Sequence, residues 1–212
     1  MDAVNPERVG ALRVAGWIRA RADPSRRFLF GLAGPPGSGK STLAGALALE
    51  LDAVVVPMDG YHLPNATLDE RGLRGVKGAP ETFDAAAFVA AVCRLAAADG
   101  DVELPDFDRA LDEPCPGRIR VRASDRIVIV EGNYLLLETE PWVELRDRFD
   151  AIAHLDLDRD TRVERLVSRH VRFGKTRAEA SAFVRASDEA NAARVEAVGQ
   201  RAHLVIDAAD RS

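Results

Sequence analysis

The sequence predicts an α/β fold in which helices cover both faces of a parallel sheet. Three observations support this class. An apolar run at 28–33 is followed by a glycine-rich turn and then by a helix-forming segment. Further apolar runs at 53–56, 127–130 and 151–155 are short enough for buried parallel strands. Helix-forming stretches separate these runs, as strand–helix–strand units require.

The composition fits one domain and argues against several classes of protein. The chain has 212 residues, of which 47% are hydrophobic, enough for a sizeable core. A net charge of −5 gives no basic surface for nucleic acid or an anionic membrane. No apolar leader or membrane-length stretch is present, and Cys93 and Cys115 lack metal or redox spacing. We therefore expect a cytoplasmic protein with reduced thiols.

The glycine-rich turn matches G-x-x-x-x-G-K-[ST], a pattern typical of a phosphate-binding loop (P-loop, or Walker A motif). Glycines lack a Cβ, so the backbone can take positive φ angles and turn its N–H groups around an anion. Lys40 is expected to reach the terminal phosphates of a nucleotide, and Ser41 to offer a hydroxyl to Mg²⁺. A flexible turn is the alternative, which the flanking strand and helix disfavour. The predicted nucleotide-binding residues are Gly34, Pro35, Pro36, Gly37, Ser38, Gly39, Lys40, Ser41 and Thr42.

Two acidic residues follow predicted strands. Asp59 comes after the run at 53–56, and Glu131 ends the run at 127–130. Because ligands bind beyond the carboxyl ends of parallel strands, both should lie on the rim that carries the P-loop. Asp59 can take a proton from an attacking hydroxyl or hold Mg²⁺ through water, and an Asp-Gly turn is an equal alternative on spacing alone. Glu131 can support Mg²⁺ and its waters, although P-loop proteins more often carry Asp there.

The other elements are expected in chain order. Residues 7–21 have the spacing of an amphipathic helix that packs on the domain. Asp84 should cap a helix that ends near Gly100. After a short helix near 142–145, His154 should be a hydrogen-bonded core residue of the fourth strand. The last apolar run, at 203–207, predicts a fifth strand.

Residues 63–125 are expected to form an insertion that binds the acceptor of the reaction. Its first part, 63–83, is long, irregular and basic, which suits an anionic or hydroxyl-rich ligand or merely solvated charge. Its second part contains the segment PDFDR at 105–109. Two acids, an aromatic ring and an arginine can bind a small polar substrate there, or can cap and neutralise one another.

Residues 160–180 predict a helical lid. Arg162, Arg165, Arg169 and Arg172 are spaced three, four and three apart, so they project from one face of a helix. Such like charges repel unless an anion lies opposite, and a triphosphate is the candidate. Thr176 and Glu179 predict a capping box for the next helix. The alternative is a solvated face that pairs with Glu164 and other acids.

Together these motifs resemble the phosphoribulokinase, uridine kinase and type I pantothenate kinase superfamily, and most closely its bacterial fructose-transport-system kinases. The motifs are GPPGSGKS, MDGYHLPN, KGAPETFD, PDFDR, VEGNYLLL, RLVSRHVRFG and the late Asp188-x-x-Asn191, which span the chain from about residue 27 onward. The resemblance implies a P-loop three-layer αβα sandwich in a single domain, 1–212. Its five-stranded parallel sheet would have the order 2-3-1-4-5, with a helical lid.

The resemblance also implies the roles of the site residues. ATP with Mg²⁺ would be the donor, and a small-molecule hydroxyl would be the acceptor. Asp59 would be the general base, and Glu131 would sit near the metal and the attacking hydroxyl. The lid arginines would be Arg165 and Arg169. The acceptor pocket would be lined by Tyr61, His62, Lys77, Asp106 and Arg109.

We therefore expect an ATP-dependent kinase for a sugar, a glycerate-like hydroxy acid or a nucleoside, with a uridine/cytidine-type or pantothenate kinase as alternative. A regulatory nucleotide-binding switch is the alternative from another class. Such a switch would read guanine through Asn-Lys-x-Asp, which this sequence lacks. A degenerate kinase that hydrolyses ATP slowly is a third reading. The sequence leaves the oligomeric state open, with a homodimer as one alternative.

Overall fold

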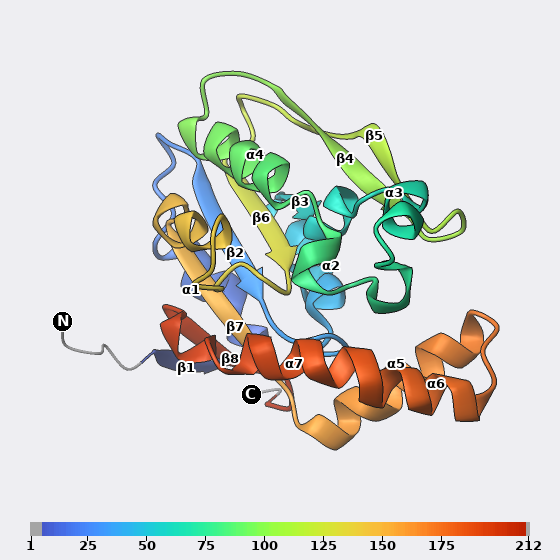
Figure 1. Cartoon of the computed structure of the whole chain (residues 1–212). Helices are drawn as coiled ribbons and strands as arrows, with labels where there is room; N and C mark the ends of the chain where they lie inside the picture. Colours follow the sequence, from blue (N-terminus) through green and yellow to red (C-terminus); the bar gives the residue numbers. More distant parts are fainter. Residues whose placement is uncertain (1–5, 211–212) are drawn as a thin grey trace.

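The computed structural model describes residues 6–210 and has a six-stranded parallel sheet at its centre (Figure 1). The five predicted strands have the predicted order, and a sixth strand, β1, extends the sheet beyond β8. The order across the sheet is β1-β8-β7-β2-β6-β3. These strands are β1 (Glu7–Gly10), β2 (Phe28–Ala33), β3 (Val54–Pro57), β6 (Ile127–Gly132), β7 (Ala151–Asp156) and β8 (Leu204–Asp207).

Strand β1 shows that the predicted helix over 7–21 was wrong at its start. Glu7–Gly10 pairs in parallel with Leu204–Asp207, and the chain becomes helical only at η1 (Ala11–Arg13) and α1 (Val14–Arg19). The apolar spacing correctly identified the helical part, since Ile18 is buried. The strand has too few residues for a side-chain period to reveal it, and the open edge of β8 supplies backbone hydrogen bonds that no sequence pattern encodes.

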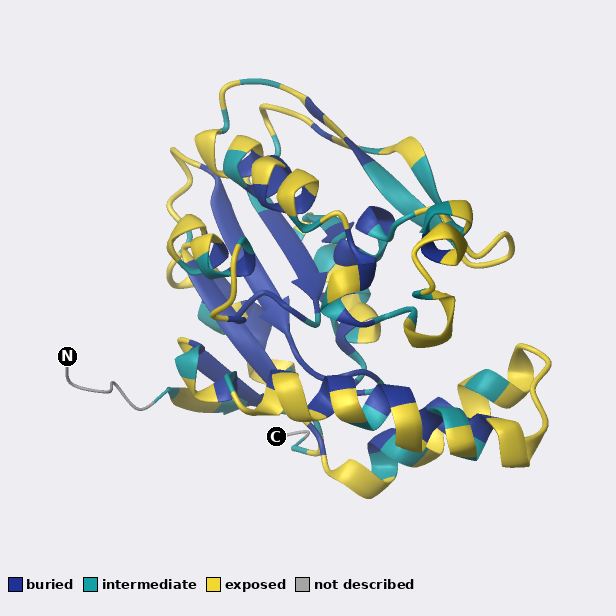
Figure 2. Cartoon of the chain, viewed as in Figure 1, coloured by how far each residue is buried: buried dark blue, intermediate teal, exposed yellow. Residues whose placement is uncertain are grey.

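Helices cover both faces of the sheet, so that β2, β6, β7 and β8 are buried almost throughout, whereas the edge strand β1 is largely exposed (Figure 2). On one face, α1 and α2 (Lys40–Leu51) pack against Phe30 and Leu32 of β2. On the other, α4 (Ala85–Ala97) and η5 (Trp142–Arg148) pack against Leu29 of the same strand. Successive residues of a strand point to opposite faces, which explains why an uninterrupted apolar run is needed here.

The predicted insertion contains more regular structure than the sequence suggested. Short helices α3 (Asn65–Glu70), η3 (Arg74–Val76) and η4 (Pro80–Thr82) precede α4, whose N-cap Asp84 accepts a hydrogen bond from the Ala87 N–H as predicted. An antiparallel pair, β4 (Val102–Asp108) and β5 (Glu113–Val121), follows. The sequence did not reveal this hairpin, because prolines at 105, 114 and 116 interrupt its strand pattern.

The region predicted as a lid lies in a helical hairpin. Helix α5 (Arg159–Arg172) packs on a long helix made of α6 (Arg177–Phe183), a π-helical turn η6 (Val184–Asp188) and α7 (Glu189–Glu196). The predicted capping box of Thr176 and Glu179 is present. A small apolar cluster, Leu166, Val167, Ala180 and Val184, lies between the two arms, so the hairpin has a core of its own.

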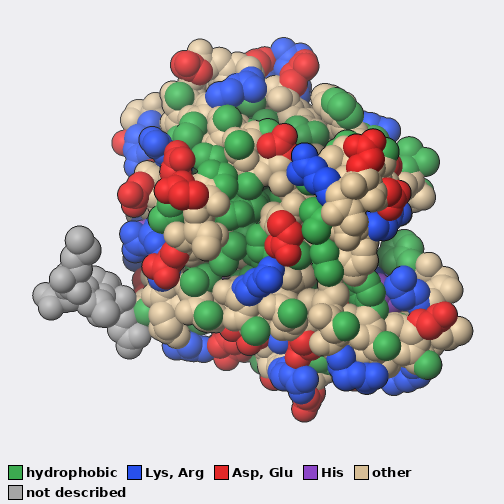
Figure 3. All heavy atoms as spheres, in the orientation of Figure 1, with side chains coloured by type: hydrophobic (Ala, Val, Ile, Leu, Met, Phe, Trp, Pro, Cys, Tyr) green, Lys and Arg blue, Asp and Glu red, His purple; other side chains and the backbone are tan. Residues whose placement is uncertain are grey.

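Two further features bear on the sequence-based expectations. Cys93 and Cys115 are free, as predicted, and no helix within residues 6–210 is long and apolar enough to cross a membrane. His154 is a core residue of β7, but its Nδ1 has no hydrogen-bond partner in the part of the chain described, and burial lowers its pKa to about 4. On the face in Figure 3, Lys and Arg side chains are interspersed with Asp and Glu.

A buried arginine gives a test of the fold. Arg27 is 6% exposed and donates to the carbonyls of Leu95, Arg122 and Asp125, which joins β2 to the end of α4 and the loop before β6. Arg27→Met should lower the free energy of unfolding by about 2–4 kcal/mol, because three carbonyls lose their donor. Urea denaturation measures this loss. The neighbouring exposed Arg26→Met is the control, and an equal effect of both variants would contradict the assignment.

Candidate active site

A cavity of about 1110 Å³ opens where β2, β3 and β6 end, between the insertion and the lid. The P-loop lines it together with Asp59 and Glu131. The predicted meeting of the P-loop with the acids that follow strands two and three is therefore observed. In parallel pairing, Glu131 of β6 lies level with Leu32 of β2 and with Pro57 of β3, so the register of the sheet sets this meeting point.

The P-loop has the backbone that an anion cradle needs. Gly37 has φ 80° and Gly39 has φ 98°, whereas Gly34 does not take a positive φ. The Ser38 hydroxyl oxygen is buried and has no hydrogen-bond partner within residues 6–210, which suits a loop built to receive a ligand. Pro36 through Thr42 line the cavity, whereas Gly34 and Pro35 lie behind its surface.

Lys40 brings a buried positive charge to this loop. It is the first residue of α2, its side chain is mostly buried, and its Nζ donates to the Pro35 carbonyl at 3.1 Å. Burial lowers the pKa of Lys40 to about 8, while the charges of Glu131 and Asp59 oppose that shift. The free protein therefore holds the ammonium in an unfavourable setting that an added anion would relieve.

Glu131 and Ser41 form a second pair beside the P-loop. The Ser41 hydroxyl donates to Glu131 Oε1 at 2.7 Å. Burial raises the pKa of Glu131 above its usual range, and the Lys40 ammonium acts in the opposite direction. Among residues 6–210 no three His, Cys, Asp or Glu side chains form a metal-binding group by themselves. This pair of oxygen donors could thus contribute to a Mg²⁺ site only together with a phosphate and water.

Asp59 reaches the cavity from η2 (Met58–Tyr61), the turn that follows β3. Two glycines permit this approach. A Cβ on Gly60 would lie 2.4 Å from the Pro105 carbonyl oxygen, and one on Gly132 would lie 2.6 Å from the Met58 Cβ. Neither position accepts a side chain, so the glycine after each acid serves close packing. The Asp59 carboxylate accepts a hydrogen bond from Arg109 at 3.2 Å.

The structure brings only part of the predicted acceptor pocket to the cavity. His62, Lys77 and Arg109 line it. Tyr61 does not, because its ring is buried in the core against Phe88 at 5.1 Å. Asp106 does not line it either, and its Oδ1 instead accepts from the N–H of the next residue. In β4, alternation sends Phe107 toward the cavity and Asp106 away from it, which the spacing of the motif did not reveal.

Aromatic rings form one wall of the cavity near His62, Lys77 and Arg109. His62 stacks on Phe83 with ring centroids 3.9 Å apart, and Phe107 lies 5.2 Å from His62. Burial lowers the pKa of His62, so the imidazole is neutral at neutral pH. Lys77 is 5.0 Å from the Phe107 ring centroid, but its ammonium is held by Asn65 and Asp112. The contacts of Lys77 therefore hold its own loop against the turn that carries Asp112.

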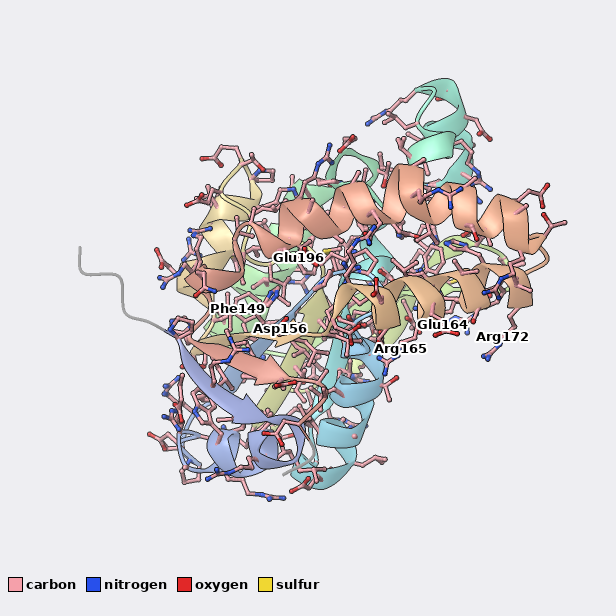
Figure 4. The ribbon with its side chains drawn as sticks, turned by 90° about the horizontal axis from the view of Figure 1, so that it is seen from below. Phe149, Asp156, Glu164, Arg165, Arg172 and Glu196 are labelled. Carbon is pink, nitrogen blue, oxygen red and sulfur yellow. The ribbon has the colours of Figure 1, made fainter. Side chains whose placement is uncertain are left out.

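The four lid arginines do not act as one set. Arg165 and Arg169 line the cavity as predicted, and Figure 4 shows Arg165 between α5 and α2 and Arg172 at the outer end of α5. Arg162 is buried and pairs with Glu189 at 3.2 Å and Glu196 at 2.9 Å. The expectation that all four would face a triphosphate was therefore wrong for Arg162, whose charge is balanced within the protein, and for Arg172, which does not line the cavity.

Several residues that line the cavity received no predicted role. Asp188 and Asn191 formed a noted motif without an assigned function; Asp188 is the last residue of the π-helical turn, and Asn191 follows in α7. His170 follows a predicted lid arginine and pairs with Asp188 at 2.8 Å. Further polar residues at the cavity without a predicted role include Asp112, Asn133 and Lys175, whereas Arg74 belongs to the loop that was noted as basic. Asp112 offered no signal, because its place depends on the unpredicted hairpin.

Several known proteins are similar to this chain. The "uncharacterized protein YggC" of Escherichia coli K12 is 38% identical over 192 residues, which cover 87% of this chain and 79% of that protein. A Schizosaccharomyces pombe protein described as a "putative uridine kinase" is 38% identical over 173 residues, covering 76% of this chain and 73% of its own. A Silicibacter crystal structure described as a "putative fructose transport system kinase" matches with a TM-score of 0.84 and 39% identity, over 93% of this chain and 98% of that one.

The chain belongs to the phosphoribulokinase, uridine kinase and pantothenate kinase superfamily. No single protein-family model matches it. As a P-loop kinase of this superfamily it is a phosphotransferase that acts on a small-molecule hydroxyl. The predicted family, fold and enzyme class are confirmed, with six parallel strands in place of five.

The shifted pKa of Lys40 gives a pH test of this P-loop kinase. Above pH 8 the free protein holds a neutral amine, whereas a bound triphosphate favours the ammonium. Nucleotide binding should then take up a proton, and affinity should fall by up to about tenfold per pH unit above 8. Below pH 8 the protonation of Lys40 should not make the nucleotide affinity depend on pH.

Calorimetry at pH 7 and pH 9, in buffers of different ionisation enthalpy, measures both affinity and proton uptake. Lys40→Arg is the matched control, because a guanidinium stays protonated across this range. A wild-type affinity that is flat from pH 7 to 9, or the same slope in the arginine variant, would show that Lys40 does not titrate there.

Proposed function

We propose that the protein transfers the γ-phosphate of ATP to an alcohol of a small molecule, with Asp59 as the general base. The observation that carries the proposal is that Asp59, Lys40 and the Ser41–Glu131 pair line a single cavity. Phosphoryl transfer requires little covalent chemistry from the protein, so positioning, charge stabilisation and exclusion of water suffice.

The choice of Asp59 over Glu131 as base rests on access and on charge. The Asp59 side chain is 34% exposed, so an acceptor hydroxyl can approach it. Glu131 is buried, its Oε1 already accepts from Ser41, and its raised pKa disfavours the ionised form in the free protein. A base must be ionised and within reach of the proton that it removes. Asp59 meets the geometric requirement better, and Glu131 is suited to the metal side.

The remaining residues at the P-loop end of the cavity stabilise the negative charge of the triphosphate. Lys40 and the N-terminus of α2 favour the negative oxygens of the triphosphate, and Arg165 and Arg169 approach from the lid. Mg²⁺ fits beside Ser41 and Glu131, which are both oxygen donors, and when bound it would neutralise charge on the phosphates. Closure of the lid hairpin over this end would exclude water from the transfer.

The acceptor is a sugar, a glycerate-like hydroxy acid or a nucleoside in this proposal. A nucleoside is the second candidate because His62, Phe83 and Phe107 offer aromatic faces at the cavity, and one relative is described as a "putative uridine kinase". Pantothenate is a further alternative. Release of ADP, measured by a coupled assay across these compounds, distinguishes a kinase with a defined acceptor from a nucleotide-binding protein without transfer.

Replacement of the base tests the mechanism. Asp59→Asn should lower kcat by about 10²–10⁴-fold, because no carboxylate remains to take the hydroxyl proton. The ATP dissociation constant should change little, since Asp59 faces the acceptor. Asp106→Asn is the matched control, because this nearby acid does not line the cavity. Full activity of Asp59→Asn, or equal losses in both variants, would assign the proton to another group.

A further inference from the structure

The turn between β4 and β5, residues 109–112, is fixed at the acceptor end of the cavity. The Asp112 carbonyl accepts hydrogen bonds from Asn65 Nδ2 at 2.9 Å and from Lys77 Nζ at 2.7 Å. The Asp112 carboxylate pairs with Lys77 at 2.9 Å and with Arg74 at 3.3 Å. A turn held at one residue by three side chains places its other residues in a defined position.

Arg109 is the cation that this turn presents to the cavity. Its NH2 group donates to Asp59 Oδ2 at 3.2 Å, and within residues 6–210 no other acceptor receives a hydrogen bond from it. A guanidinium carries five N–H donors, so most of its capacity remains unused. The Arg109 side chain is 54% exposed, which leaves room for a ligand beside it.

The cations near this turn differ in their ion pairs. Arg74, Lys77 and Arg109 all line the cavity. Arg74 and Lys77 both pair with Asp112, whereas the ion pair of Arg109 within residues 6–210 is with Asp59. If Asp59 takes a proton during the reaction, Arg109 loses its counter-ion as well. A carboxylate of the ligand would then supply a counter-ion to Arg109.

We propose that the acceptor is a hydroxy acid, and that its carboxylate binds Arg109. Binding would draw the guanidinium from Asp59 Oδ2 to the carboxylate of the ligand, which it can hold through two parallel hydrogen bonds. Asp59 is then free to accept the hydrogen bond of the acceptor hydroxyl. A neutral alcohol provides no group to displace the arginine, and Asp59 stays engaged. This inference rests on the proposed function, since it concerns the acceptor of the same transfer.

Matched pairs of acceptors test the proposal. The pairs are glycerate with glycerol, pantothenate with pantothenol, and gluconate with glucitol, and uridine and ribose serve as further neutral compounds. ADP release with the full-length chain and ATP–Mg²⁺ should show turnover with at least one acid and at least about tenfold lower kcat/KM for its neutral partner. Preference for a neutral alcohol, sugar or nucleoside would overturn the inference and leave the kinase proposal standing. No transfer to any compound would overturn both.

Substitution of Arg109 tests the contact itself. Arg109→Gln should lower kcat/KM for the preferred acid by about 10–100-fold, and change that for its neutral partner by less than about threefold. Arg109→Lys should retain part of the preference for the acid over its neutral partner. Lysine keeps the positive charge but cannot make the two parallel hydrogen bonds of a guanidinium. Arg118→Gln is the matched control, since this exposed arginine of the same hairpin does not line the cavity. Equal losses of kcat/KM for acid and neutral acceptors in Arg109→Gln would show that Arg109 does not bind the carboxylate.

Discussion

The site depends on an ammonium group placed where water is largely excluded and no protein anion fully balances it. Lys40 has one carbonyl as hydrogen-bond partner, and its pKa falls to about 8 because burial disfavours the charge. Glu131, which opposes that shift most strongly, is itself buried and holds the Ser41 hydroxyl. Burial disfavours the charged form of both groups in the free protein. A triphosphate would stabilise the ammonium of Lys40, and its metal would stabilise the carboxylate of Glu131. The charges of the P-loop and its surroundings therefore already favour an anionic ligand.

Backbone packing then determines where the acids can lie relative to that charge. The parallel register aligns Glu131 with the end of β3, and the glycine that follows each acid lets η2 approach both β6 and β4. A side chain at Gly60 or Gly132 would push these elements apart and move Asp59 away from the P-loop. The pairing of an acid with a following glycine thus reflects a close approach of three segments, and the Asp-Gly turn suspected from the sequence is part of the functional geometry.

The features predicted correctly from the sequence are those that local physics determines. The P-loop follows from glycine, lysine and serine at fixed spacing, the sheet strands from apolar runs, and the helix starts at Asp84 and Thr176 from capping side chains. Features that depend on distant partners escaped prediction. Strand β1 needs the edge of β8, and the inward direction of Phe107 needs the hairpin partner β5. Arg162 was predicted to be a lid arginine because it shares the helical spacing of Arg165 and Arg169. Its actual partners, Glu189 and Glu196, lie some thirty residues further along the chain.

The same buried arginine holds the base of the helical hairpin against the P-loop. Arg162 joins the base of α5 to α7 through two ion pairs and donates to the Pro36 carbonyl of the P-loop at 3.4 Å. Removal of both partners would leave a buried charge unpaired, and the contact with Pro36 joins this base to the P-loop. The outer end is different, because Phe173 is 61% exposed and Gly174 takes φ 97° at the turn between the arms. The π-helical turn lies between these two regions, at Val184–Asp188, where the helix departs from regular hydrogen bonding. This turn also brings Asp188 to the cavity, so the outer part of the hairpin and the cavity wall belong to one continuous helix.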